Sequence, residues 1–120
     1  MNELIDFLKD NFEKNSYTIT FCDFLIDDMW EAVSIEFHKN SKHYSIYYFE
    51  YQGRITDVIK WGEIYPELEA EFLLVKETLS SNGYELESYG AIKNKEREMI
   101  LRIRKDPYYF DFRLSSAKAK

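Results

Sequence analysis

The chain has 120 residues, which is enough for one hydrophobic core and too few for two. Its 10 Tyr, 9 Phe and 2 Trp exclude wholesale disorder, and only 4 Gly and 2 Pro leave most of the chain to helices and strands. The net charge of −6 disfavours general binding to nucleic acids or to anionic membranes.

The first predicted elements are a helix and a strand. Within residues 3–14 apolar side chains recur at i, i+4 and i+8, which predicts an amphipathic helix. The residues on its buried side are Leu4, Leu8 and Phe12. Residues 17–26 are rich in β-branched and aromatic residues and are predicted as a strand, which ends at a turn marked by Asp27-Asp28.

A hairpin is predicted next, with strands at residues 30–38 and 43–51 around a four-residue loop at 39–42. Pairing His38 with His43 places six apolar residues on one face, and register follows such a buried set. The six are Val33, Ile35, Phe37, Tyr44, Ile46 and Tyr48. The opposite face then carries polar residues together with an unusual number of large rings, from Trp30, Tyr47, Phe49 and Tyr51.

The second half of the chain predicts another helix and more strands. An apolar stripe over residues 64–82 predicts a helix that stops at Asn82-Gly83. Its glutamates are expected on a solvated face; they are Glu63, Glu67, Glu69 and Glu71. Residues 84–92 and 97–104 are predicted as a second hairpin, with a last short strand at 108–114 and either a strand or a loop at 54–61.

The predicted order of elements is α-β-β-β-(β)-α-β-β-(β), which defines an α+β fold. Short connections make neighbouring strands antiparallel, and the two amphipathic helices can cover one face. We therefore expect a two-layer sandwich with a mainly antiparallel sheet of five to seven strands. Residues 1–114 are expected to form a single domain, and residues 115–120 a flexible C-terminal tail.

No residue pattern indicates catalysis, a metal or a cofactor. His38 and His43 lie beside Glu36 in the predicted hairpin but lack a third protein ligand for zinc or iron. Cys22 stands next to an aspartate, unlike a reactive thiol in an electropositive setting, and is expected to be a buried structural residue. The scattered glycines form no phosphate-binding loop. We predict no catalytic residue, no metal and no cofactor, and favour a non-enzymatic protein.

The cysteine content and the first residues of the chain predict the cellular compartment of the protein. Cys22 is the only cysteine, so no intrachain disulfide forms, which fits a reducing compartment. The first residues are acidic where a secretory signal is basic. No apolar run approaches the ~20 residues of a membrane-spanning helix. These features predict a soluble, cytoplasmic protein that binds neither membranes nor nucleic acid.

The distribution of charge and aromatic rings leaves two questions open. Residues 1–90 hold 18 acidic and 7 basic residues, whereas residues 91–120 hold 4 acidic and 9 basic residues. The basic part either neutralises the acidic part within the fold or leaves an acidic surface for a basic partner. The rings on the second face of the 30–51 hairpin allow two interpretations. Residues 108–114 or the first helix cover them, or they are exposed as a protein-binding patch or a dimer contact.

The chain resembles small acidic bacterial inhibitors, above all immunity proteins that neutralise a co-encoded toxin. Its size, acidity, single cysteine and aromatic segment 44–51 carry the resemblance, and the helix 66–82 after Trp61-Gly62 adds to it. The resemblance implies a non-enzymatic protein whose carboxylates and aromatic side chains block a basic active site, such as that of a nuclease-type toxin. The candidate partner-binding residues are Asp23, Asp27, Asp28, Trp30, Glu31, Glu36, Tyr47 and Tyr51.

Alternatives from other classes stay open at this point. In one, the aromatic residues line a pocket between a curved sheet and the second helix, and the chain is a small-molecule-binding or enzymatic domain. In another, the chain is a homodimer with a structural role.

Overall fold

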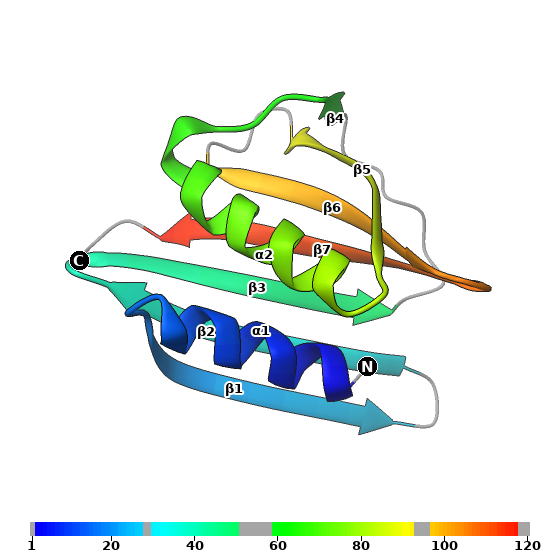
Figure 1. The fold of residues 1–120 in the computed structure, drawn as a ribbon, viewed down its shortest axis with the longest axis horizontal. Coiled ribbons are helices and arrows are strands. Elements are labelled where there is room, and N and C mark those ends of the chain that lie inside the picture. The colour runs from blue at the N-terminus through cyan, green and yellow to red at the C-terminus, as the bar shows by residue number, and fades with distance from the viewer. Residues whose placement is uncertain (1, 28–29, 51–58, 93–96, 118–120) are drawn as a thin grey trace.

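The structure is a computed structural model that describes residues 2–27, 30–50, 59–92 and 97–117, with side chains for 3–23, 32–48, 61–92, 97–107 and 110–116. Seven strands form one antiparallel sheet in the order β1-β2-β3-β7-β6-β5-β4, and both helices lie on one face of it (Figure 1). The helical elements are α1 (Asn2–Lys14), the 3-10 turn η1 (Pro66–Leu68) and α2 (Glu69–Ser81). The strands are β1 (Thr18–Asp27), β2 (Trp30–Lys39), β3 (Lys42–Glu50), β4 (Ile59–Trp61), β5 (Glu85–Ile92), β6 (Glu98–Lys105) and β7 (Tyr108–Ala117). The predicted two-layer α+β fold is confirmed.

The β2–β3 hairpin has the predicted register. His38 pairs with His43, and the six apolar residues that this register was expected to bring together are all buried. The connection is shorter than predicted, because Lys39 pairs with Lys42 and leaves a two-residue turn. Asn40 takes a φ of 57° in that turn, and asparagine tolerates this left-handed region better than most residues.

The second helix begins later than predicted and ends where it was expected. Tyr65 precedes a proline and is therefore extended, with φ −71° and ψ 130°, so no helix can start at residue 64. Pro66 opens the 3-10 turn, and α2 follows from Glu69. At the other end Asn82 caps the helix and Gly83 has a φ of 80°, a conformation that favours glycine.

The C-terminal strand is longer than predicted and lies inside the sheet. β7 runs to Ala117, so the first three residues of the predicted tail belong to a strand. They are held by β3: Ser115 pairs with Ser45, with the two hydroxyl oxygens 2.6 Å apart, and Ala117 pairs with His43. Because β7 lies between β3 and β6, it joins the two hairpins edge to edge. Of the segment 54–61, Ile59–Trp61 forms β4, and residues 54–58 lie outside the described residues.

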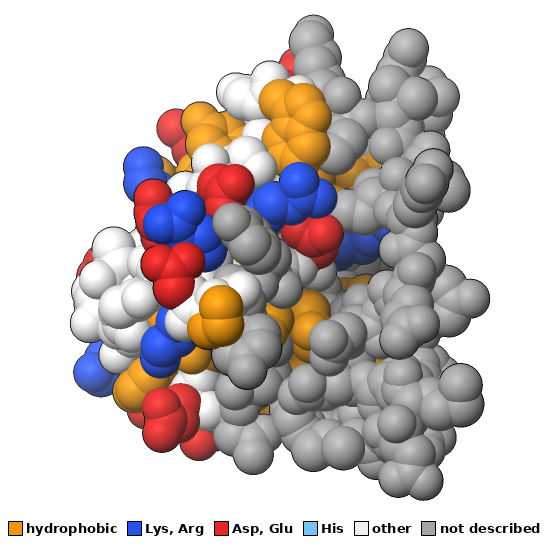
Figure 2. Space-filling view, turned by 90° about the vertical axis from the view of Figure 1, so that its right-hand side faces the viewer, with side chains coloured by type: hydrophobic (Ala, Val, Ile, Leu, Met, Phe, Trp, Pro, Cys, Tyr) orange, Lys and Arg blue, Asp and Glu red, His pale blue; other side chains and the backbone are white. Residues whose placement is uncertain are grey.

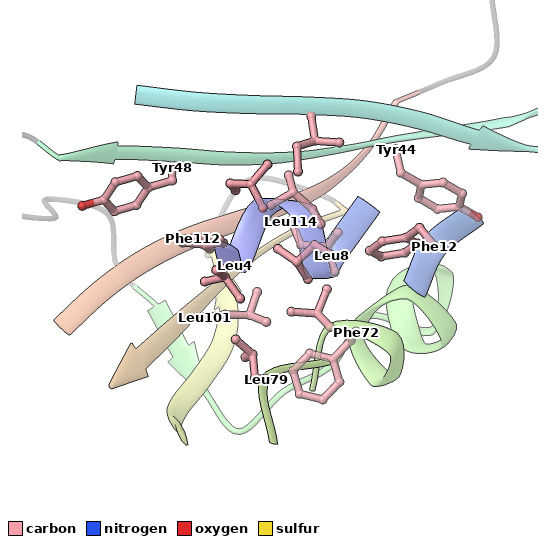
Figure 3. Packing of buried hydrophobic residues seen from close by; sticks show 14 of the residues in the cluster. Leu4, Leu8, Phe12, Tyr44, Tyr48, Phe72, Leu79, Leu101, Phe112 and Leu114 are labelled. Carbon is pink, nitrogen blue, oxygen red and sulfur yellow. The ribbon is translucent and has the colours of Figure 1, made fainter. Parts of the chain in front are cut away.

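The core lies between the sheet and the helices. α1 contributes Leu4, Leu8 and Phe12, and α2 contributes Phe72, Val75 and Leu79, as their spacing predicted. Figure 3 shows Leu4, Leu8 and Leu79 of the helices close to Leu101, Phe112 and Leu114 of the sheet. The burial of both helical stripes against one sheet face is what makes the two layers a single unit.

One glutamate predicted on a solvated face is buried instead. Glu71 is 3% exposed, and the Tyr17 hydroxyl donates a 2.5 Å hydrogen bond to its carboxylate. Burial, together with this hydrogen bond, raises the pKa of Tyr17 above its ordinary value, and burial beside Glu71 does the same to the pKa of Tyr44. The prediction for α2 is wrong at this position because a buried carboxylate is tolerated where a hydroxyl donor reaches it.

Candidate functional site

The sheet face on which no described helix lies is the candidate binding surface, and we call it the helix-free face. The helices cover the face that holds Val33 and Ile46, and alternate residues of the same strands point the other way. On β1–β3 the described residues of the helix-free face include Phe21, Asp23, Ser34, Glu36, His38, His43, Ser45 and Tyr47. The sequence suggested that residues 108–114 or the first helix could cover the aromatic rings of this face. Neither does so, because β7 lies within the sheet and α1 lies on the opposite face (Figure 1).

Three of the predicted site residues lie close together on this face. Asp23 pairs with Ser34, which pairs with Tyr47, so these residues form one row across β1, β2 and β3. Glu36 lies two residues along β2, in the adjacent row. Strands are spaced about 4.8 Å apart, so the Asp23 and Tyr47 backbones are about 10 Å apart. Asp23 and Glu36 are exposed, and Tyr47 is 41% exposed.

The other five predicted site residues are placed only in part. Asp27 pairs with Trp30 at the end of the β1–β2 ladder, and Glu31 pairs with both Ile26 and Glu50. The side chains of Asp27, Trp30 and Glu31 lie outside the described residues. Asp28 and Tyr51 lie outside them entirely. The backbone therefore brings three of the five to the same hairpin as Asp23 and Glu36.

The sequence prediction missed Phe21, whose side chain is 46% exposed opposite Glu36. A β-bulge between Ile19 and Phe21 resets the alternation of β1, so that Phe21 and Asp23 both lie on the helix-free face. Counting alternate residues back from Asp23 places Phe21 on the same face, and this spacing is the signal that could have identified it. Cys22 is exposed rather than buried, because β1 is the outermost strand and nothing described covers its side.

The arginines of β6 and β7 are neutralised within the sheet. Two hydrogen bonds join Arg102 to Asp111, from Nε to Oδ1 at 3.0 Å and from Nη2 to Oδ2 at 3.4 Å, and they raise the pKa of Arg102 above its ordinary value. The other ion pairs are Arg113 with Glu98 at 3.2 Å, and Arg104 with Asp106 at 3.2 Å and with Glu85 at 3.5 Å. In Figure 2 the described acidic and basic side chains of one side of the molecule lie next to one another.

The acidic residues of β1 and β2 differ from this pattern. Among the described residues, neither Asp23 nor Glu36 takes part in an ion pair. The basic C-terminal part therefore neutralises the β6–β7 half of the sheet, and the described carboxylates of the β1–β2 half keep their charge uncompensated. Neutralisation within the fold, one of the two charge arrangements predicted from the sequence, is therefore seen in the β6–β7 half of the sheet.

The two histidines meet at the hairpin end, with ring centroids 5.5 Å apart. Across the described ranges, no group of three or more His, Cys, Asp or Glu residues is arranged to hold a metal ion. His43 is exposed and His38 is half-buried, so the described surroundings are those of a solvated pair.

A groove of about 410 Å³ lies between α1 and α2 rather than beneath them. Its lining is mainly polar: Phe7, Asp10, Asn11, Lys14, Glu77, Thr78, Ser81 and Asn82. Asn11 links the two helices by donating to Thr78 Oγ1 at 2.8 Å and to the Leu74 carbonyl at 3.2 Å. The space between α2 and the sheet, where an aromatic pocket was considered, holds the packed side chains of Phe72, Leu79 and Leu101 (Figure 3).

These features define a class: an α+β protein whose seven-stranded antiparallel sheet has two helices on one face and, on the other, the exposed residues Phe21, Asp23, Glu36 and Tyr47. Comparison with protein-family models, curated proteins and solved structures gives no match. Within the described ranges, no helix has the length and apolar character needed to cross a membrane.

Proposed function

We propose that the chain is a non-enzymatic binding protein of the immunity type, which inhibits a basic protein such as a nuclease-type toxin through the β1–β3 part of the helix-free face. The observation that carries the proposal is the exposure of Tyr47, 41% of whose side chain is accessible on a strand inside the sheet. A one-sided sheet normally presents polar residues at such a position. Aromatic side chains are enriched in protein interfaces, where Tyr supplies large contact area at a low entropic cost.

The neighbours of Tyr47 indicate the chemistry of the partner. Phe21 adds a second exposed ring and pairs with Glu36, while Asp23 lies in the same row as Tyr47; neither acid has a described basic partner. Arg113, which pairs with Tyr47 on β7, forms an ion pair with Glu98. Uncompensated carboxylates around aromatic anchors suit a basic partner, because they speed encounter and disfavour acidic competitors. In this arrangement the carboxylates take the positions of substrate phosphates in the partner's active site.

The test uses the proteins encoded beside this chain, each purified and titrated with the full chain by calorimetry and stopped flow. We expect a basic partner to bind. For that partner, Tyr47→Ser should weaken binding by about 2 kcal/mol, the loss typical of a central aromatic anchor. The pair Asp23→Lys and Glu36→Lys should slow association, more strongly at low salt than at high salt.

Matched controls come from the helix layer. Leu73 is 51% exposed on α2 and Glu77 is exposed on the same helix, so Leu73→Ser and Glu77→Lys repeat the chemical changes on the other side of the molecule. Both should leave affinity and association rate unchanged. If they weaken binding while the β1–β3 variants do not, the helix-free face is the wrong surface.

Two further measurements separate inhibition from the other classes of function. An immunity-type protein should abolish its partner's enzymatic activity at an equimolar ratio, whereas a simple binder would leave that activity intact. Native mass spectrometry of the purified chain should show no bound metabolite or metal. A stoichiometric small ligand would instead favour the pocket-containing alternative.

A further inference from the structure

The groove between α1 and α2, which run side by side (Figure 1), has no part in the proposed function. Its volume of about 410 Å³ lies within the range of about 300–1,000 Å³ that small-molecule sites occupy. Its floor is fixed, because Asn11 of α1 donates to Thr78 Oγ1 of α2 at 2.8 Å, and Thr78 is only 4% exposed. The two helices are therefore held at a set distance, and the groove is formed before any ligand arrives.

The hydrogen-bond donors of the groove lining are directed towards the helices themselves. Besides its bond to Thr78, Asn11 Nδ2 donates to the Leu74 carbonyl at 3.2 Å, and Thr78 Oγ1 donates to the same carbonyl at 2.8 Å. Asn82 Nδ2 donates to the Thr78 carbonyl at 2.7 Å. The two side-chain amides therefore keep mainly their oxygens for a ligand, and such a lining suits a ligand that donates hydrogen bonds.

The charges of the lining favour a cation. Asp10 on α1 and Glu77 on α2 are exposed carboxylates, and within the described ranges neither forms an ion pair. Lys14 is the basic residue of the lining, so two acids and one base give it a net charge of −1. The groove also lies at the C-terminal end of α2, whose last turn contains no basic residue and whose dipole favours positive charge.

Phe7 adds apolar surface to this lining. Its side chain is 36% exposed, and it comes from the same helix as Asp10. An aromatic ring near carboxylates attracts an ammonium group by a cation–π interaction, and it also offers a surface on which an alkyl chain can pack. The lining therefore combines acceptors and negative charge with an apolar ring.

We propose that this groove is a binding site for a small organic cation, a linear diamine or polyamine, whose ammonium groups pair with Asp10 and Glu77 and whose alkyl chain lies against Phe7. Because the two carboxylates belong to different helices, a ligand with two ammonium groups can contact both of them, and a monoamine cannot. The proposal does not depend on the proposed function, since the groove and the helix-free face lie on opposite sides of the sheet.

Titration of the native chain with diaminobutane, followed by amide NMR spectra, tests the site. We expect saturable shifts that map to the groove, with a dissociation constant of about 1 mM, a strength suited to so small a ligand. Butanediol has a similar length and no charge, and it should cause no saturable shift. Butylamine should bind about threefold more weakly, because it can pair with only one carboxylate. Binding of this strength is lost during purification, so the purified chain should still carry no metabolite.

Conservative variants identify the carboxylates. Asp10→Asn and Glu77→Gln should each weaken diaminobutane binding about threefold, within the range measured for exposed ion pairs. Glu13→Gln is the matched control, because Glu13 is exposed on α1 outside the lining, and it should change the dissociation constant by less than about 1.5-fold at physiological salt. Lys14→Gln should instead strengthen binding about twofold, since it removes a competing cation. These positions are all exposed, so the variants should fold.

Several results would overturn the proposal. One is a set of shifts that do not saturate, or that butanediol reproduces. Another is a loss for Glu13→Gln equal to that for Asp10→Asn, because diffuse surface charge and not the groove would then attract the cation. Saturable shifts centred on Tyr47 and Asp23 would assign the cation to the helix-free face. None of these results bears on a basic protein partner, and the absence of such a partner would leave the groove proposal intact.

Discussion

The two faces of the sheet are built by alternate residues of the same strands, yet they differ sharply in burial. On β3, Tyr48 is 3% exposed beneath the helices, and its neighbour Tyr47 is 41% exposed on the helix-free face. On α2, Leu79 is fully buried and Leu73 is 51% exposed. The same residue type is therefore buried in the core at one position and exposed at another, depending only on what packs against it.

This comparison indicates where the chain can change without unfolding. The helix-covered face concentrates the buried apolar side chains, and it also holds the Glu71–Tyr17 hydrogen bond. The β1–β3 part of the helix-free face holds exposed rings and carboxylates. Substitutions on the first face should alter the free energy of unfolding, and substitutions on the second should alter binding.

A large expected effect separates two leucines of α2. Leu79→Ala removes a side chain with no exposure and should lower the free energy of unfolding by about 2–5 kcal/mol, because it leaves a cavity between α2 and the sheet. Leu73→Ala is the matched control and should change it by less than about 0.5 kcal/mol. Urea denaturation of both variants measures the difference, and equal losses would contradict the burial assigned to α2.

Next in size is the removal of the buried carboxylate. Glu71→Ala leaves the Tyr17 hydroxyl, on a residue that is 6% exposed, without its acceptor, and should cost about 1–3 kcal/mol. Glu69→Ala is the control, because Glu69 is exposed in the same first turn of α2 and feels the same helix dipole. A loss for Glu69→Ala as large as that for Glu71→Ala would show that the dipole, and not the buried hydrogen bond, is responsible.

Local patterns in the sequence were sufficient to predict the elements and the hairpin register. A slip of one residue in β2 would have moved Val33, Ile35 and Phe37 to the other face, so one register was strongly preferred. The position of β7 was not predictable in this way. It joins residues 112–117 to 43–48, and no local pattern encodes a pairing between segments so far apart. For that reason the sequence could not distinguish a segment 108–114 that covers the rings of β3 from one that pairs with β3 inside the sheet, as β7 does.

The candidate site was predictable where alternation was regular and missed where it was not. Tyr47 and Glu36 follow from the hairpin register, and both are exposed. Phe21 was missed because an extra residue in β1 shifts the alternation, and such a bulge has no distinct composition. Glu71 was predicted on a solvated face because its burial depends on Tyr17, which is 54 residues away in the chain.

A smaller effect should appear at alkaline pH on the helix-covered face. Burial and Glu71 raise the pKa of Tyr17, so the folded protein keeps a proton that the unfolded chain releases near pH 10. The resulting stabilisation is complete below that pH and is lost as the pH rises towards the pKa of the folded protein. Between pH 8 and pH 11 the native chain should lose about 1 kcal/mol more than Tyr17→Phe, as urea denaturation at both pH values would show. An equal loss in the two proteins would mean that Tyr17 does not titrate differently on folding.

A small change in stability is expected at the centre of the proposed binding surface. Tyr47→Ser should cost at most about 1 kcal/mol, the range of strand propensity, because much of the ring is already in water. Tyr48→Ser, one residue along β3, should cost about 3–5 kcal/mol, since its ring is enclosed with Phe110 and Phe112. Thermal and urea unfolding of the two variants would measure this contrast. If Tyr47→Ser destabilised the protein as much as Tyr48→Ser, the Tyr47 ring would be part of the core, and its exposure would no longer support a binding role.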